Sequence, residues 1–328
     1  MRKTNFGKKK IIASILCANM MLMSMPLNTL ASEITGITPN GNTYNIEAAK
    51  VSGSTGFRHY DKFDLSKGDI ANLVYKNNYS KFVNLVNDQI KINGLVQTLK
   101  DNSFYNGHAI FVSPNGMIVG ASGLLNVGSL SVLTPNQNSY NAFKSAYEVG
   151  GLEEYQYNNS EYNNLIKSSD GKIIINGKIL AREEVNLYGS DIQIGDGANR
   201  AGIIAGYSGE NTFSDLSAAE ATFNSLVSNN ITNTNGFALS DGKIQIVANK
   251  ELVLGDAAGN ITAKVDIKKA DIGANEVDIS STAKVDRQKR IDLAEAKVNI
   301  EDSNITGDTV KITANASQNK KLNTEHYR

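Results

Sequence analysis

HAIFVSPNGMIVGASGLLNVGSLSVLTP, residues 108–135, is the stretch of sequence that decides the fold. Two short apolar runs, residues 109–112 and 117–119, flank the tetrapeptide SPNG at 113–116. The tetrapeptide supplies a side-chain acceptor, a fixed φ, a turn-tolerant amide and a glycine in the order that a type I turn prefers. Glycines then recur between further apolar pairs. Short strands joined by sharp corners, with small residues where backbones approach closely, predict a stacked β-coil rather than a flat sheet.

Alternating apolar residues continue through the rest of the chain. Strand-sized units lie between turn dipeptides such as Asn-Gly and Asp-Gly, among them KIIIN (172–176), DIQIG (191–195), KIQIVA (243–248), EVDIS (276–280) and TVKIT (309–313). A period of two indicates strands with one buried face, and successive units follow at about 6–13 residues. We therefore predict an all-β fold, a right-handed parallel β-helix with short helical and loop insertions. A β-sandwich remains the structural alternative, because it would show comparable strands.

The β-helix predicts aligned interior rows of aliphatic side chains, with their charged neighbours outside. The residues expected in these rows are Ile173, Ile175, Ile244, Ile246, Val265, Ile267, Val277, Ile279, Val310 and Ile312. The aspartates between them are expected to be outward residues, namely Asp266, Asp271, Asp278 and Asp292.

Two insertions interrupt the β pattern. Residues 211–231 place apolar side chains on one helical face, and Ser217 with Glu220 forms a capping-box pattern, so a short amphipathic helix on the flank of the coil is predicted. Residues 138–168 are rich in Tyr and Asn and predict a second insertion, part helix and part loop. Its helical part is expected to place three aromatic residues on one face, Tyr140, Phe143 and Tyr147.

Residues 79–99 allow two interpretations. Their apolar residues fit a helix in the first half, whereas IKINGLVQTL (90–99) fits a hairpin around Asn93-Gly94. Both interpretations stay open at this point.

The first 31 residues have the pattern of a secretory signal peptide. Residues 1–10 carry five basic residues and no acid, residues 11–25 are largely apolar, and small residues follow at the positions that a signal peptidase reads. We predict cleavage between Ala31 and Ser32. The apolar run is too short for a comfortable transmembrane span, and Cys17 lacks the flanking residues of a lipoprotein signal.

Loss of this leader would change the charge and the cysteine content of the chain. The leader holds five of the 33 basic residues and none of the 33 acidic ones, so 28 would face 33, a net charge of −5. A mildly acidic chain without a basic stripe is not expected to bind nucleic acid. Cys17 is the only cysteine, so the exported chain must be stabilised by packing without disulfides.

Candidate catalytic and metal-binding residues are sparse. His59, His108 and His326 lie outside metal-ligand spacing of one another, so no zinc site is expected. GDGANRAG (195–202) has two glycines of a dinucleotide fingerprint but Arg200 in the third place, and is interpreted as a corner loop. Acids are spread evenly rather than clustered for calcium binding or acid–base catalysis. We expect no enzymatic activity, no cofactor and no metal; the alternative is a secreted β-helical enzyme that degrades polysaccharides.

The frame around SPNG resembles the N-terminal secretion domain of filamentous haemagglutinin-type exoproteins of the two-partner secretion pathway. That family carries Asn-Pro-Asn-Gly-Ile in a similar frame, and here Ser replaces the first Asn and Met the Ile. The residues matched to the motif are Ser113, Pro114, Asn115, Gly116 and Met117. HYDKFDLSKGDIANLVY (59–75) is similar to the family's Tyr-x-x-Phe-x-Val segment. The chain is closest in character to leukotoxin-type filamentous adhesins, and the resemblance covers residues 34–200.

This resemblance implies a division of the chain and a role. After the leader (1–31), residues 32–200 would form the secretion domain. Residues 201–328 would hold the helical insertion near 211–231 and the first coils of a longer β-helix shaft, so the chain is expected to be a fragment of a larger adhesin or toxin.

The resemblance also implies a partner and a place in the cell. An outer-membrane β-barrel transporter with periplasmic recognition domains would recognise the secretion motif, and the domain would nucleate β-helix folding outside the cell. The protein would be secreted or held at the surface of a Gram-negative-type bacterium, without stable insertion into the membrane. Host-cell binding, and with it a role in virulence, would belong to a region beyond this chain.

Overall fold

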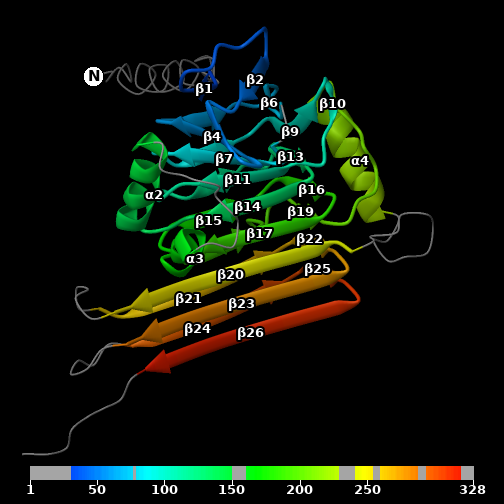
Figure 1. Cartoon of the computed structure of the whole chain (residues 1–328). Helices are drawn as coiled ribbons and strands as arrows, with labels where there is room; N and C mark the ends of the chain where they lie inside the picture. The colour runs from blue at the N-terminus through cyan, green and yellow to red at the C-terminus, as the bar shows by residue number, and fades with distance from the viewer. Residues whose placement is uncertain are drawn as a thin grey trace, which may run out of the picture. The chain divides into compact units, whose positions relative to one another are not determined.

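The computed structural model describes residues 31–76, 79–149, 160–228, 241–253, 259–286 and 293–318. The chain divides into two units, Met1–Ser32 and Glu33–Arg328. The second unit is mostly β, with parallel sheets of many strands (Figure 1). The expected leader, with Cys17, lies almost wholly outside the described residues, and cleavage after Ala31 stays a prediction.

The described strands form three sheets, here called A, B and C. Sheet A contains β1 (Glu33–Ile34), β5 (Phe63–Leu65), β8 (Ile90–Ile92), β12 (Met117–Val119), β15 (Lys172–Ile175), β18 (Asp191–Ile194), β21 (Ile261–Lys268) and β24 (Ala294–Glu301). Sheet B contains β2 (Thr43–Glu47), β6 (Ile70–Val74), β9 (Leu95–Lys100), β10 (Ser103–Phe104), β13 (Leu124–Val127), β16 (Lys178–Ala181), β19 (Ala201–Ile204), β22 (Ala270–Gly273) and β25 (Asn304–Thr306). Sheet C contains β3 (Lys50–Ser52), β4 (Thr55–Tyr60), β7 (Lys81–Val86), β11 (His108–Val112), β14 (Ser129–Leu133), β17 (Glu184–Gly189), β20 (Lys243–Leu252), β23 (Glu276–Val285) and β26 (Thr309–Gln318).

From β4 onward the chain passes through sheet C, sheet A and sheet B in turn, and then returns to sheet C. We call one such passage a circuit. Strands of successive circuits pair in parallel, so that Lys81 of β7, for example, lies between Thr55 of β4 and His108 of β11. Among the described pairings, β1–β5, β3–β4 and β9–β10 are antiparallel. Long parallel sheets are not the pairing of a β-sandwich, the alternative considered from the sequence.

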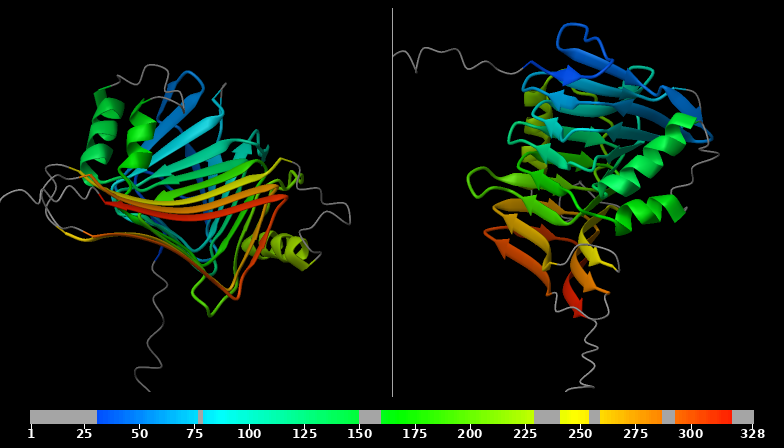
Figure 2. Two further views of the ribbon diagram at one scale, coloured as in Figure 1. Left: turned by 90° about the horizontal axis from the view of Figure 1, so that it is seen from below. Right: turned by 90° about the vertical axis from the view of Figure 1, so that its left-hand side faces the viewer.

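The three sheets surround a common interior (Figure 2). The apolar residues of the alternating strands form one large core cluster. Eight of the ten residues predicted for interior rows are buried: Ile173, Ile175, Ile244, Ile246, Val265, Ile267, Val277 and Ile279. Val310 and Ile312 keep the predicted register opposite Val277 and Ile279. They are nevertheless 41% and 47% exposed, because they lie on β26, the last strand of sheet C, beyond which no described strand pairs.

Residues 79–99 form neither a helix nor a hairpin. They contain β7, β8 and most of β9, which belong to sheets C, A and B respectively. Asn93-Gly94 is the corner between β8 and β9, and a Cβ atom added to Gly94 would lie 2.2 Å from the carbonyl oxygen of Asp69. The glycine is therefore needed where one corner stacks on the next, as the sequence pattern predicted for corners in general.

The two predicted insertions are helical. α2 (Gln137–Val149) and α3 (Ser160–Lys167) pack on the outer face of sheet C (Figure 2). Tyr140, Phe143 and Tyr147 are buried there, which confirms their predicted helical face. They share an apolar cluster with sheet C residues, among them Phe57, Val83 and Ile110.

The second insertion contains α4 (Leu216–Ser228), which lies on sheet B. The predicted capping box is wrong. Asp215 caps the helix, because its Oδ1 atom accepts a hydrogen bond of 2.9 Å from the backbone N–H of Ala218. Ser217 already lies inside the first turn.

The last circuits have a fixed length. Lys243, Glu276 and Thr309 are register partners on β20, β23 and β26, spaced 33 residues apart, and the same spacing separates Asp266 from Asn299, whose side chains are joined by a 2.7 Å hydrogen bond. The first circuits are shorter, with 26 residues between the bonded corner residues Asp61 and Asn87. The two circuits that carry the helical insertions are longer, with 55 residues between the register partners Leu130 and Val185 and 59 between Glu184 and Lys243. The regular repeat therefore begins after the α4 insertion.

Candidate functional site

The SPNG tetrapeptide forms the corner between β11 of sheet C and β12 of sheet A. Ser113 is buried, and its Oγ donates to the carbonyl oxygen of Asp88 at 2.8 Å while accepting from the N–H of Asn115 at 3.1 Å. The N–H of Gly116 donates to the carbonyl oxygen of Ser113 at 3.3 Å, which closes a β-turn as predicted. Serine thus fixes the turn to the preceding corner.

Gly116 and Met117 fix the same corner to both neighbouring circuits. Gly116 has φ = 85°, and a Cβ atom there would lie 2.1 Å from the carbonyl oxygen of Lys172 in the following circuit. Its own carbonyl oxygen accepts from the N–H of Ile90 in the preceding circuit at 3.0 Å. Met117 is fully buried and pairs with Ile90 and Ile173. Only glycine fits the first position, and an apolar side chain is required at the second.

Pro114 and Asn115 form the accessible part of the corner. Pro114 is half-buried and Asn115 is exposed. The Nδ2 atom of Asn115 donates to the carbonyl oxygen of Asn87 at 2.7 Å, and Gln89 donates to the carbonyl oxygen of Asn115 at 3.4 Å. Asn115 is therefore a surface amide in a fixed orientation.

Asn87, which the sequence analysis did not single out, connects this corner to its surroundings. Its Nδ2 atom donates to Asp61 at 2.6 Å, and its Oδ1 atom accepts from Tyr140 at 3.1 Å and Lys144 at 3.3 Å of α2. The Nε2 atom of His59 lies 3.0 Å from the same oxygen. Four side chains thus meet on one amide. We call Asp61, Asn87 and residues 113–116 the motif corner.

The α2–α3 insertion lies at the corresponding corner of the next circuit, between β14 and β15. Asn136 caps α2 by accepting a 2.9 Å hydrogen bond from the N–H of Ser139. Burial raises the pKa of the Tyr140 hydroxyl well above its usual range, so the group stays protonated and donates to Asn87. α2 is therefore bonded to the motif corner through Tyr140 and Lys144.

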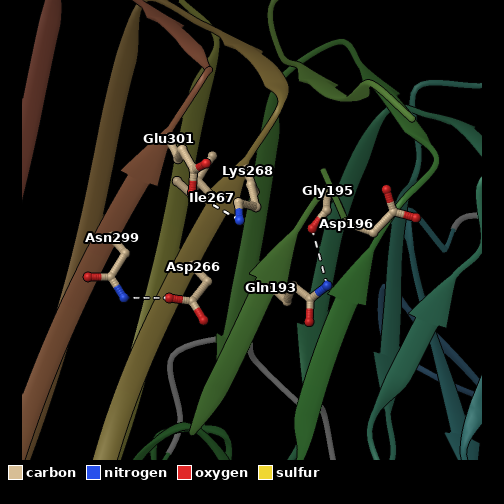
Figure 3. A pocket seen from close by; sticks show the side chains of 8 residues that line it. All are labelled: Gln193, Gly195, Asp196, Asp266, Ile267, Lys268, Asn299 and Glu301. Atoms are coloured by element: carbon tan, nitrogen blue, oxygen red, sulfur yellow. Dashed lines mark hydrogen bonds and ion pairs between the residues drawn. The ribbon is translucent and has the colours of Figure 1, made fainter. Parts of the chain in front are cut away.

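A second polar site is a cleft of about 350 Å³ on the outer face of sheet A (Figure 3). It is lined by residues of β18, β21, β24 and the corners beside them: Gln193, Gly195, Asp196, Asp266, Ile267, Lys268, Asn299 and Glu301. Its polar groups pair with one another, as in the 2.7 Å bond from Asn299 to Asp266 and the 3.0 Å ion pair between Lys268 and Glu301.

Asp266 in this cleft does not have the properties of a catalytic proton donor. Burial raises the pKa of Asp266, but hydrogen bonds from Lys264 and Asn299 outweigh it and leave the pKa below its usual value. Glycoside hydrolysis needs an acid with a raised pKa. The lowered pKa of Asp266 therefore does not favour a role for this residue in glycoside hydrolysis.

The other sequence-predicted residues are distributed over the fold. Residues 195–200 form the corner between β18 and β19, as predicted; Gly195 and Gly197 have positive φ, and Asp196 accepts from the N–H groups of Ala198 and Asn199. Asp271 does not lie in water as expected, because Arg200 covers it at 2.7 Å and leaves it 4% exposed.

Metal sites and membrane-spanning helices can be considered for the described residues only. These residues contain no group of three or more His, Cys, Asp or Glu side chains placed to hold a metal ion. In the same part of the chain, no helix is both long and apolar enough to cross a membrane. Asp292 and His326 lie outside the described residues.

Comparisons with known proteins find no match: no protein-family model and no curated protein resembles the chain closely enough. The function must therefore be inferred from the residues and their geometry. The motif corner is the site at which sequence resemblance and an ordered, accessible structure coincide.

Proposed function

We propose that this chain is the N-terminal secretion domain of a larger exported adhesin or toxin, recognised during export by an outer-membrane β-barrel transporter with periplasmic domains. The observation that carries the proposal is the motif corner. Its buried members, Ser113 and Gly116, are fixed between circuits, whereas Asn115 is held in one orientation at the surface. A rigid corner with an oriented amide suits recognition by a partner protein better than it suits chemistry.

The fold we propose for this domain is a right-handed parallel β-helix. The rotating order of sheets C, A and B and the in-register parallel pairing of successive circuits support it. In such a stack each new circuit buries another apolar layer, so folding that begins with the first circuits outside the cell would favour further export of the chain.

Variants of the motif corner test the proposed function. Asn115→Ile removes the oriented amide, and Pro114→Leu removes the fixed φ of the turn. Each variant is expected to reduce secretion through the cognate transporter at least tenfold, measured as the ratio of secreted to cell-associated protein. Asn199→Ala, at the exposed corner between β18 and β19, is the matched control and should be secreted like the wild type.

Thermal unfolding of the purified variants separates recognition from misfolding. The variants are expected to keep β-rich circular dichroism, because the buried contacts of Ser113 and Gly116 remain. Wild-type secretion of both folded variants would refute the proposal and leave SPNG as an ordinary corner.

A further inference from the structure

The outer face of sheet B is covered by a part of the chain that lies far from it in sequence. Between β19 and β20, residues 205–215, which we call the strap, cross sheet B toward its earlier strands. α4 follows the strap and runs back along the same face (Figure 1). Neighbouring circuits make the same connection from sheet B to sheet C with two residues, 182–183 or 274–275. The insertion is therefore not needed to complete the circuit.

Four amide side chains are aligned across neighbouring strands of sheet B, two of which the strap contacts through these amides. Register pairs Asn45 of β2 with Asn72 of β6, Asn72 with Gln97 of β9, and Gln97 with Asn126 of β13. We call these four residues the amide row. Asn72 donates to Asn45 at 2.8 Å, and Gln97 donates to Asn72 at 3.0 Å. Asn45, Asn72 and Gln97 thus orient one another through these two bonds.

Two residues of the amide row, Gln97 and Asn126, bind the backbone of the strap. Gln97 donates to the carbonyl oxygen of Phe213 at 3.0 Å and accepts from the N–H of the same residue at 3.1 Å. Asn126 donates to the carbonyl oxygen of Asn211 at 2.9 Å. These bonds go to alternate residues and to main-chain atoms only, as in the recognition of an extended peptide.

Arg182 holds the beginning of the strap. Its Nε atom donates to the carbonyl oxygen of Gly209 at 2.8 Å, and its guanidinium lies 3.8 Å from the ring centroid of Phe104 and 5.0 Å from that of Tyr207. Burial lowers the pKa of Arg182 to about 10, so the side chain remains a cation in this aromatic site.

The rest of the insertion packs on apolar residues of sheet B. Phe213 and Ala219 pack in one cluster with three strand residues, Ile70, Leu95 and Leu124. Phe223 and Leu226 pack in a second cluster with Leu180 and Ile204. The ring of Phe223 lies over Gly202, where an added Cβ atom would come within 2.3 Å of it. Because Gly202 has no side chain, the ring of Phe223 fits over the sheet at this position. Beside it, Lys178 and Glu220 form an ion pair of 3.2 Å.

We propose that the outer face of sheet B is a peptide-binding groove, which the strap and α4 occupy within the chain and which a segment of the export partner occupies in the complex. This inference rests on the proposed function. The partner segment has the chemistry of the present occupant: an extended stretch with an aromatic residue, whose backbone Gln97 and Asn126 bind, followed by an amphipathic helix. The amide row also continues beyond the strap to Asn45, which is exposed, so the groove accommodates a longer extended segment than the strap.

A peptide-binding measurement tests the groove itself. The probe is a fluorescein-labelled synthetic peptide of residues 205–228, and the protein is the chain with residues 206–241 replaced by a short glycine-rich linker. This strapless protein should bind the peptide at least 100-fold more tightly than the intact chain, whose groove is occupied. Gln97→Ala in the strapless protein should weaken binding about tenfold. Asn299→Ala, on the outer face of sheet A, is the control and should leave binding unchanged. Absence of binding to a strapless protein with wild-type circular dichroism would overturn the inference.

Hydrogen exchange on the intact chain covers the case in which the strapless protein does not fold. Gln97→Ala should speed exchange of the Phe213 amide at least tenfold, because the side-chain oxygen that accepts from it is removed. Unchanged exchange at Phe213 would show that the amide row does not hold the strap, and would refute the inference.

A second measurement uses the purified periplasmic domains of the cognate barrel transporter that the proposed function requires. They should bind the strapless protein at least tenfold more tightly than the intact chain, and the peptide should compete. Equal binding of both forms, without competition, would overturn the groove as the partner's site while the proposed function stands. Binding of neither form would refute the proposed function and the partner assignment together.

Discussion

Asn87 and Asn115, which lie one circuit apart, have different roles at the motif corner. Asn115 is exposed and has few contacts, so it is available to a partner, whereas Asn87 contacts four side chains and organises the surface around it. The two residues are 28 positions apart in sequence, and their adjacency follows from the stacking of circuits alone. Motif matching finds the first residue and cannot find the second.

His108 makes stability depend on pH at the residue scale. Burial and the ammonium group of Lys81 lower its pKa to about 3. Its Nε2 atom lies 2.8 Å from Ser131 Oγ, and Glu184 lies 3.8 Å from Nδ1 on the other side. The unfolded chain takes up a proton near pH 6.5 and the folded chain does not. The stability of the folded state with neutral His108 is therefore fully present above pH 6.5. It is lost progressively as pH falls toward 3, because protonation of His108 then favours the unfolded chain.

We expect the free energy of unfolding, measured by urea titration, to fall between pH 7 and 5 with a slope approaching 1.4 kcal/mol per pH unit, roughly one proton's worth. His108→Gln should flatten the curve in this window, because it removes the titrating group. An unchanged slope in His108→Gln would show that other groups dominate. Lys81→Met removes a cation that lowers the pKa of His108 in the folded state. The loss of stability should then begin at the same pH but stop at a higher pH, so that the total loss is smaller.

At the scale of the element, the alternation of buried and exposed residues explains most strands, and its loss explains why neither interpretation of residues 79–99 holds. β23 alternates along its length, and its type can be read from the sequence. In β7 both faces are buried, because α2 covers the outer one, so Val83 and Leu85 break the period of two. A helix-like spacing resulted from two apolar faces on one strand.

Ile246 tests the interior rows. It is fully buried on β20 and pairs with Ile279, which in turn pairs with Ile312. Ile246→Asp places an unpaired carboxylate in the stacked core and should cost roughly 3–5 kcal/mol in the free energy of unfolding. Ile312→Asp is the matched control in the same row, and since that side chain is 47% exposed, it should cost under about 1 kcal/mol.

Chemical denaturation followed by circular dichroism measures both variants. Equal costs for the two substitutions would contradict the assignment of Ile246 to a closed interior row.

At the scale of the whole molecule, local patterns predicted the parallel β architecture, the corner at SPNG and the two helical insertions. What they missed depends on distant parts of the chain. Gln97 and Phe213 are 116 residues apart, and only the folded register brings the amide row to the strap. The helix cap was misplaced by two positions, because Asp215 and Ser217 are both good capping residues and tertiary packing selects where α4 begins.

Processing of the precursor belongs to the same scale. If the leader is a signal peptide, the exported chain should begin at Ser32, and N-terminal sequencing or intact-mass measurement of secreted protein checks this. Secreted material that begins at Met1, or that carries a lipid on Cys17, would contradict the prediction.

The strap has a mechanical consequence. Pulled from its last strand, a stack of parallel strands unzips circuit by circuit, and each 33-residue circuit releases about 110 Å of chain. When unzipping reaches β20, further extension requires a higher force, because the strap is bound to Gln97 and Asn126 on strands of earlier circuits. To go further, the force must also break those bonds and pull Phe223 from its seat over Gly202. The strap thus resists unfolding under force. The first circuits stay folded while the later ones extend under tension.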